Sequence, residues 1–363
     1  MTPFGAYDMA GNVREWCWNE APEGRILRGG AWNDAVYLFK FLAQASPFER
    51  SPRNGFRCAL YPAPETIPKT AFEMIEVSEV PDFYKVEPVS DPVFEVIKEQ
   101  CSYDKTDLNA RIEWRDESST DWVQEKITFD AAYDNERVTA YLFLPRDTPS
   151  PYQTVIHFPG MGPFDLIRSS KDLDQYGEFD FNLSFIVKRG RAVLFPVYKG
   201  TFERGPTDWW GPPRQLVELG FKMIKDLKRS IDYLETRPDI DSGRLAFNGL
   251  SMGGALGAIF LAMEDRLKAS ILVVGGIFPD GDTSGQINSL PRVRIPTLML
   301  NGRYDLTFPY ETSVKPMFDL LRTPKEHKDL KLYETGHFVP RNELIKETLN
   351  WLDRYLGPVK RID

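Results

Sequence analysis

The stretch Gly249-Leu250-Ser251-Met252-Gly253-Gly254 decides the fold, because it sets a serine between a short apolar run and an apolar helical segment. The run at 244–247 is typical of a buried strand, and residues 255–263 are typical of a helix. So tight a turn needs small residues two positions before and after the serine, and both positions hold glycine. The pattern predicts that Ser251 stands above the edge of a sheet as a candidate nucleophile.

Short apolar runs bounded by turn residues recur on both sides of this turn, as is typical of strands buried in a parallel sheet. They lie at 154–158, 192–197, 245–247, 271–274, 298–300 and 330–333. Two alternating segments, 127–132 and 138–144, predict an antiparallel hairpin ahead of them. Apolar residues at three- and four-residue steps over 217–234 predict a long amphipathic helix. The order predicts an α/β fold with a mixed, mostly parallel sheet and helices on both faces.

Ser251 needs a base, because a serine hydroxyl is a poor nucleophile at neutral pH. The chain has three histidines. His327 lies in a charged run that we expect to face solvent, and His157 ends a predicted strand ahead of the serine. In the chain order typical of this strand-turn-helix motif, the acid and then the histidine follow the serine. His337, directly after the last predicted strand, is the histidine that fits this order.

The candidate acid is Asp305, which follows the predicted strand at 297–300. A carboxylate there can reach the second imidazole nitrogen, fix the tautomer and stabilise the imidazolium. Two competitors lie nearer to His337 in sequence. Asp329 precedes the last strand, at the opposite end of the sheet, and Glu334 lies at the end of that strand. We therefore predict that Asp305 completes the triad with the serine and His337.

An oxyanion that forms on the substrate needs two backbone N–H donors. Met252, the residue after the nucleophile, is one candidate. The other is Met161, in the glycine-containing loop at 157–162 that follows a predicted strand. His157 either orders this loop or is a plain packed histidine, and both interpretations stay open.

The chain divides into three parts by composition. Residues 1–62 are rich in Gly, Trp, Arg and Asn and predict a small irregular module. Residues 63–121 form a Pro-containing connector with a short helix that opens at Asp91-Pro92, where Asp91 is the expected N-cap. Residues 122–363 form the catalytic domain. Within it, charged residues crowd the segment 163–190 that we expect to cover the site, which favours small or short-acyl substrates over lipids.

Residues 122–359 resemble the α/β-hydrolases of the dienelactone-hydrolase and prolyl-oligopeptidase-like group. The matching residues are the Gly160 loop, the turn at Ser251, Asn301-Gly302-Arg303-Tyr304-Asp305 and Gly336-His337. The resemblance implies the α/β-hydrolase fold and a serine carboxylesterase that works through an acyl-enzyme, with no organic cofactor. A peptidase or thioesterase on the same triad is the first alternative. The closest resemblance is to hydrolase modules at the C-terminus of bacterial serine/threonine kinase proteins, so a non-catalytic regulatory module is the second.

Residues 4–60 resemble the C-terminal part of formylglycine-generating enzymes. The matching segments are 4–16, 28–32 and 55–58. The redox-active cysteine pair of that family would fall near Tyr37 and Leu42, and neither position holds a thiol. The sequence therefore excludes the oxidation that this family performs and predicts a catalytically dead remnant.

The remnant contains a candidate calcium loop. The resemblance implies ligands at Asp8, Gly11, Val13 and Glu15. Carboxylates and backbone carbonyls within so short a segment suit a hard cation that prefers oxygen ligands. A plain capped turn is the alternative.

The composition limits the partners. The net charge is −8, and no cluster of Lys and Arg stands out, which argues against nucleic acid and anionic membranes as partners. Three cysteines are too few for a disulfide framework, although a Cys17–Cys58 bridge stays open. We expect a cytoplasmic protein with free thiols that acts on a small-molecule ester, with a homo-oligomer as a candidate state.

Overall fold

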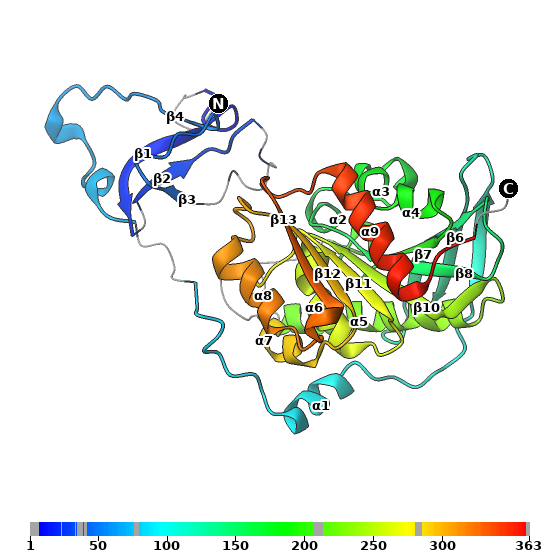
Figure 1. Cartoon of the computed structure of the whole chain (residues 1–363). Coiled ribbons are helices and arrows are strands. Elements are labelled where there is room, and N and C mark those ends of the chain that lie inside the picture. Colours follow the sequence, from blue (N-terminus) through cyan, green and yellow to red (C-terminus); the bar gives the residue numbers. More distant parts are fainter. Residues whose placement is uncertain are drawn as a thin grey trace. The chain divides into compact units, whose positions relative to one another are not determined.

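The computed structural model describes residues 7–22, 24–32, 34, 39, 42–75, 80–205, 213–279 and 285–360. The chain forms two compact units, Met1–Val80 and Pro81–Asp363 (Figure 1). The second unit contains Ser251 and both of its predicted triad partners. None of the helices in the described ranges is both long enough and apolar enough to cross a membrane.

The second unit is built on a nine-stranded sheet. The strands follow one another across it as β13 (Lys328–Tyr333), β12 (Thr297–Gly302), β11 (Ala269–Val273), β10 (Ile240–Leu250), β8 (Tyr152–Phe158), β9 (Ala192–Val197), β7 (Arg137–Pro145), β6 (Trp122–Asp130) and β5 (Arg111–Asp116). Strands β8 to β13 run parallel, and β5, β6 and β7 are antiparallel to their neighbours. The predicted hairpin and the six predicted strands are therefore confirmed, except that β13 lies at the sheet edge and is half-buried rather than buried.

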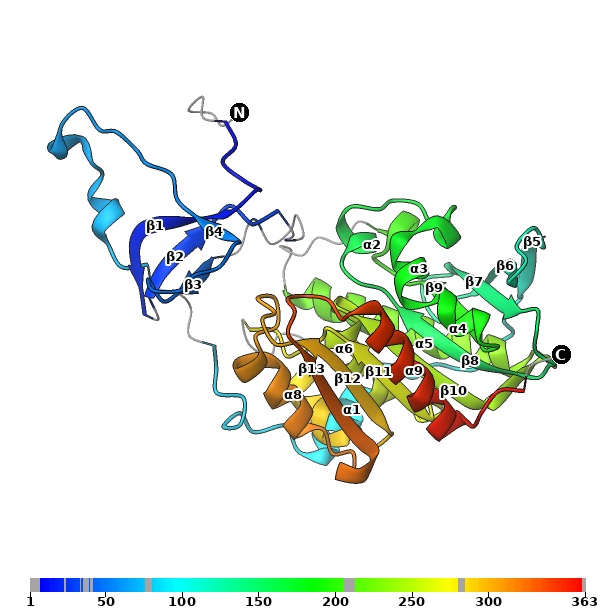
Figure 2. The same cartoon turned by 45° about the horizontal axis from the view of Figure 1, so that its top comes forward.

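Helices cover both faces of this sheet (Figures 1 and 2). The helices of the unit are α1 (Asp91–Glu99), α2 (Gly162–Asp165), α3 (Gly177–Asn182), α4 (Ser184–Lys188), α5 (Pro213–Glu235), α6 (Met252–Met263), α7 (Gln286–Ser289), α8 (Lys315–Leu320) and α9 (Arg341–Leu356). Apolar side chains of α3, α4 and α9 form one core with the sheet. The predicted amphipathic helix is α5, which packs with α6 on the opposite face. The chain has the α/β-hydrolase fold.

The part of the chain expected to be only a connector contributes to this unit. Strand β5 lies within it and pairs with β6 at the sheet edge. The prediction missed β5 because every residue of Arg111–Asp116 is exposed, so no alternation of apolar and polar residues marks the strand. The short helix is present as α1, but its N-cap is Ser90 rather than Asp91, and Asp91 is its first residue.

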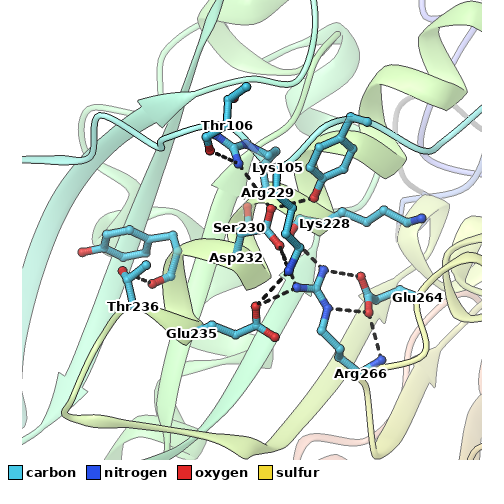
Figure 3. A network of polar contacts seen from close by, with 12 residues as sticks. Lys105, Thr106, Lys228, Arg229, Ser230, Asp232, Glu235, Thr236, Glu264 and Arg266 are labelled. Atoms are coloured by element: carbon cyan, nitrogen blue, oxygen red, sulfur yellow. Dashed lines mark hydrogen bonds and ion pairs between the residues drawn. The ribbon is translucent and has the colours of Figure 1, made fainter.

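Residues 81–110, which we name the strap, bind to α5 through a polar network (Figure 3). Arg229 donates to the carbonyl oxygens of Thr106 and Asp107 at 3.1 and 3.2 Å. The Tyr103 hydroxyl donates to Asp232 at 2.7 Å. Arg266, which follows α6, donates to the other oxygen of Asp232 at 2.7 Å. The strap is therefore fastened to α5, and Asp232 joins this contact to the segment that follows α6.

The first unit has a four-stranded sheet with little other regular structure in its described residues. Its order is β3 (Ala43–Ala45), β2 (Gly24–Arg28), β1 (Arg14–Ala21) and β4 (Asn54–Gly55). A buried ion pair joins Arg14 to Asp34 at 2.6 Å. Cys17 and Cys58 are both free thiols, so the disulfide that the sequence left open is not formed. Tyr37 lies outside the described residues.

Candidate active site

Ser251 occupies the turn between β10 and α6, in a backbone conformation that side chains rarely adopt. Its φ is 53° and its ψ is −104°. Such strain persists where the surroundings enforce it. Here the amide of Ser251 donates to the carbonyl oxygen of Val273 at 2.8 Å. A Cβ at Gly249 would lie 2.2 Å from the carbonyl oxygen of Gly253, and one at Gly253 would lie 2.3 Å from a carbonyl oxygen of β8. The two glycines are therefore required by the close approach of backbone on both sides.

The structure brings the three predicted triad residues together. Ser251 Oγ lies 2.8 Å from His337 Nε2, and His337 Nδ1 lies 2.7 Å from Asp305 Oδ2. Only 2% of the surface of Asp305 is exposed. Its second oxygen accepts hydrogen bonds from the amides of Thr307 and Phe308 at 2.8 and 3.2 Å. Hydrogen bonds thus hold both oxygens of the carboxylate, as is expected of a group that orients an imidazole.

The residues weighed against these three have other partners. Glu334 forms an ion pair with Arg303 at 2.8 Å, and Asp329 forms one with Lys331 at 2.8 Å. His327 Nδ1 lies 3.1 Å from the hydroxyl of Tyr355 on α9. Asp305, in the loop after β12, is therefore the acid that contacts His337, and the two competing acids contact other side chains.

The loop with Met161 lies against the serine turn. The amide of Gly253 donates to the carbonyl oxygen of Pro159 at 3.1 Å, and a Cβ at Gly160 would lie 3.7 Å from Ser251 Cβ. Within the described ranges, neither the amide of Met161, which precedes α2, nor that of Met252, the first residue of α6, donates to a backbone oxygen of a turn or loop. Both predicted oxyanion donors therefore lie on segments that border the serine.

The structure adds one residue to this site that the sequence did not indicate. Glu178, on α3, is buried and accepts a hydrogen bond from the amide of Gly160 at 3.0 Å. His157, whose role was left open, is fully buried, with Nε2 at 2.7 Å from Glu178 Oε1. Glu178 follows His157 by 21 residues, inside the charged covering segment, so no sequence pattern joins the two.

The candidate calcium loop in the first unit does not offer a free set of oxygen ligands. Arg57 donates to Glu15 Oε1 from Nε at 3.1 Å and from Nη2 at 3.0 Å. Arg57 Nη2 also donates to the carbonyl oxygen of Asp8 at 2.5 Å. The guanidinium of Arg57 thus places a positive charge beside Asp8 and Glu15. The other two candidate ligands are Gly11 and Val13. Calcium binding at this loop stays a prediction.

Two family models match the chain. Residues 1–61 match the sulfatase-modifying factor enzyme 1-like domain, and residues 203–363 match the PET hydrolase-like family. Cutinase 1 of Thermobifida cellulosilytica is 34% identical over 193 residues, which cover 46% of this chain and 68% of that protein. Bis(hydroxyethyl) terephthalate hydrolase of Streptomyces coelicolor is 30% identical over 199 residues, covering 48% of this chain and 59% of that protein.

Solved structures show the same fold for the second unit. Acetyl xylan esterase 1 of Thermoanaerobacterium superposes with a TM-score of 0.58 at 16% identity, over 74% of this chain and 96% of that one. This chain spans 56 to 68% of the length of the cutinases that it matches in sequence. Association with a serine/threonine kinase stays a prediction.

Proposed function

Since the chain belongs to the family of the cutinases and PET hydrolase-like enzymes and is a carboxylic ester hydrolase, we propose that it hydrolyses small or short-acyl esters through an acyl-enzyme on Ser251. The observation that supports this most is the unbroken series of hydrogen-bonding distances from Ser251 Oγ through His337 to Asp305, at 2.8 and 2.7 Å. A nucleophile, a base and an orienting acid in that order are what acyl transfer from an ester requires.

The proposed reaction has two halves. His337 Nε2 takes the hydroxyl proton as Ser251 Oγ attacks the ester carbonyl carbon, and Asp305 stabilises the imidazolium. The amides of Met161 and Met252 stabilise the oxyanion. His337 then gives the proton to the departing alcohol. In the second half, His337 takes a proton from water, which attacks the acyl-enzyme, and returns it to Ser251 as the carboxylic acid leaves.

Two features bear on the substrate. The first part of the covering segment, residues 163–180, contains seven charged residues: Asp165, Arg168, Lys171, Asp172, Asp174, Glu178 and Asp180. Six of these seven do not enter the buried core, which leaves a polar cover unsuited to a long acyl chain.

A second candidate substrate class is the aromatic diester. Phe338 follows the triad histidine and is 51% exposed, and Leu166 follows α2 and is 68% exposed. An exposed apolar side chain next to His337 suits an aromatic acid group better than a fully charged rim would. The name of the Streptomyces relative points to the same class. A thioesterase and a peptidase on the same triad are the alternatives.

A substrate panel and a covalent label test the proposal together. The panel contains p-nitrophenyl acetate, butyrate and palmitate, bis(hydroxyethyl) terephthalate, an acyl thioester and a peptide anilide. We expect the highest kcat/KM with a short ester or the diester. A fluorophosphonate should label one residue, Ser251, as located by peptide mass spectrometry. Labelling elsewhere, no labelling, or faster cleavage of the anilide than of any ester would overturn the proposal.

A further inference from the structure

The peptide group between Pro159 and Gly160 is held on both sides. Its carbonyl oxygen accepts a hydrogen bond from the amide of Gly253 at 3.1 Å. Its N–H donates to Glu178 Oε1 at 3.0 Å and lies 3.3 Å from Oε2. Gly253 belongs to α6, which begins directly after Ser251, and Glu178 belongs to α3. One peptide group is thus clamped between the serine helix and the covering segment.

The next peptide group along the chain carries the amide of Met161. Its orientation depends on the backbone angles of Gly160, and glycine lacks the Cβ that limits those angles in other residues. The space around Gly160 adds little restriction, since a Cβ there would meet its nearest atom at 3.5 Å. On the far side of Met161, α2 holds the chain through the amide of Phe164, which donates to the carbonyl oxygen of Met161 at 3.0 Å. On the near side, the clamp on the preceding peptide group limits the direction of the Met161 N–H.

The carboxylate of Glu178 is itself held in place. His157 Nε2 lies 2.7 Å from Oε1, and the Tyr176 hydroxyl donates to Oε2 at 2.9 Å. Burial, together with the negative charge of Glu178, raises the pKa of Tyr176, so the phenol keeps its proton and remains a donor. His157 Nδ1 lies 2.8 Å from Asn248 Oδ1 on β10, the strand that leads to Ser251. These contacts join the carboxylate to the strand beneath the nucleophile.

We infer that Glu178 is a positioning residue for the oxyanion hole, which directs the Met161 N–H by holding the N–H of Gly160. The inference rests on the proposed function. Glu178 does not touch the substrate in this account, and His157 acts as its support. The role requires an oxygen acceptor at the place of Oε1 and does not require the negative charge.

Three substitutions separate the acceptor from the charge. Glu178→Leu removes both oxygens, Glu178→Gln keeps one oxygen at the same reach, and Glu178→Asp keeps the charge but shortens the reach. Loss of one oxyanion donor typically lowers kcat on the order of 10²-fold. We expect Glu178→Leu to approach that loss, Glu178→Asp to lie between, and Glu178→Gln to stay within about tenfold of the wild type, with KM nearly unchanged throughout.

The readouts are kcat per active site, KM, and the inhibition constant of a short-chain trifluoromethyl ketone, whose adduct with serine carries an oxyanion. Since such an analogue resembles the transition state, its inhibition constant should rise in step with the fall in kcat. Active sites are counted by fluorophosphonate titration, and folding is followed by circular dichroism. If Glu178→Leu does not fold, the test is whether kcat is higher for Glu178→Gln than for Glu178→Asp.

A buried carboxylate far along the sheet provides the control. Glu125, on β6, is fully buried and binds Arg115 and Arg237, both at 2.7 Å. Strands β8, β9 and β7 separate it from β10. Glu125→Gln should lower stability and leave kcat per active site unchanged.

Two results would overturn the inference: a kcat for folded Glu178→Leu close to that of the wild type, or a Glu178→Asp enzyme at least as active as Glu178→Gln. A wild-type protein that neither hydrolyses esters nor reacts with the fluorophosphonate would instead overturn the proposed function, so the two failures are distinct.

Discussion

Gly302 and Gly336 approach so closely that a Cβ at Gly302 would lie 1.8 Å from the carbonyl oxygen of Gly336. Gly302 ends β12, three residues before Asp305, and Gly336 directly precedes His337. The amide of Tyr304 also donates to the carbonyl oxygen of Thr335 at 2.9 Å. The acid loop and the histidine loop therefore meet backbone to backbone, and this contact sets the distance between the two triad partners.

Gly302→Ala should consequently separate Asp305 from His337. A displacement of about 1 Å within a catalytic site can cost on the order of 10²-fold in rate, and we expect a loss of kcat of that order together with a lower Tm. Gly220→Ala is the matched control, because Gly220 lies in α5 with nothing within 4 Å of its added Cβ. There alanine should raise the Tm slightly, since it favours helix. Equal kcat values for the two variants would contradict this account.

The sequence predicted the parts of the site that local rules determine. The two glycines around Ser251 predict a tight turn. The chain order of serine, acid and histidine indicates Asp305 and His337 among a few candidates. It could not predict Glu178, because the position of α3 depends on how a charged, weakly periodic segment packs over the sheet. It missed β5 because an exposed edge strand lacks the alternation that burial imposes on other strands.

The strap network should make stability sensitive to acid through Asp232. Burial alone would raise the pKa of Asp232, but hydrogen bonds from Arg266 and Tyr103 stabilise its carboxylate and lower the pKa. A carboxyl with a lowered pKa stabilises the fold above its unfolded pKa of about 4, and that contribution is lost as the pH falls further. Asp232→Asn should be less stable than the wild type at pH 7, by about 2 kcal/mol or more.

Urea unfolding at pH 7, 5 and 3.5 measures this effect. The gap between the wild type and Asp232→Asn should narrow toward pH 3.5. Asp265→Asn is the control, because Asp265 is exposed and its ion pair with Lys98 should contribute less than about 1 kcal/mol. A gap that stays constant over the three pH values would show that the charge of Asp232 is not the cause.

The strap should also be needed for folding of the catalytic unit. It buries Phe83 and Phe94, and Arg292 lies over the Phe94 ring with 4.3 Å to its centroid. Full burial of a phenylalanine contributes about 1.5–3 kcal/mol. A chain that begins at residue 111 should therefore melt roughly 10 °C or more below one that begins at residue 81, or not fold. Similar melting curves for the two truncations would show that the strap is only a linker.

Acyl-chain length tests the interpretation of the covering segment. We expect kcat/KM for p-nitrophenyl esters to be highest at four carbons or fewer and to fall toward palmitate, because a mostly charged cover offers little apolar surface to a long chain. The measurement is kcat/KM for each ester of the series, assayed without detergent. A steady rise from butyrate to palmitate would mean that an apolar channel exists where we place a polar cover.

The most direct test of the central claim is kcat for short-ester hydrolysis in Ser251→Ala, His337→Ala and His327→Ala, measured side by side on folded protein. Loss of a triad member lowers kcat by on the order of 10⁴–10⁶-fold. We expect that loss for Ser251→Ala and His337→Ala, with melting temperatures close to that of the wild type. His327→Ala should be nearly normal, because His327 contacts Tyr355 on α9. More than a tenth of wild-type activity in Ser251→Ala, or an inactive His327→Ala beside an active His337→Ala, would contradict the proposed mechanism.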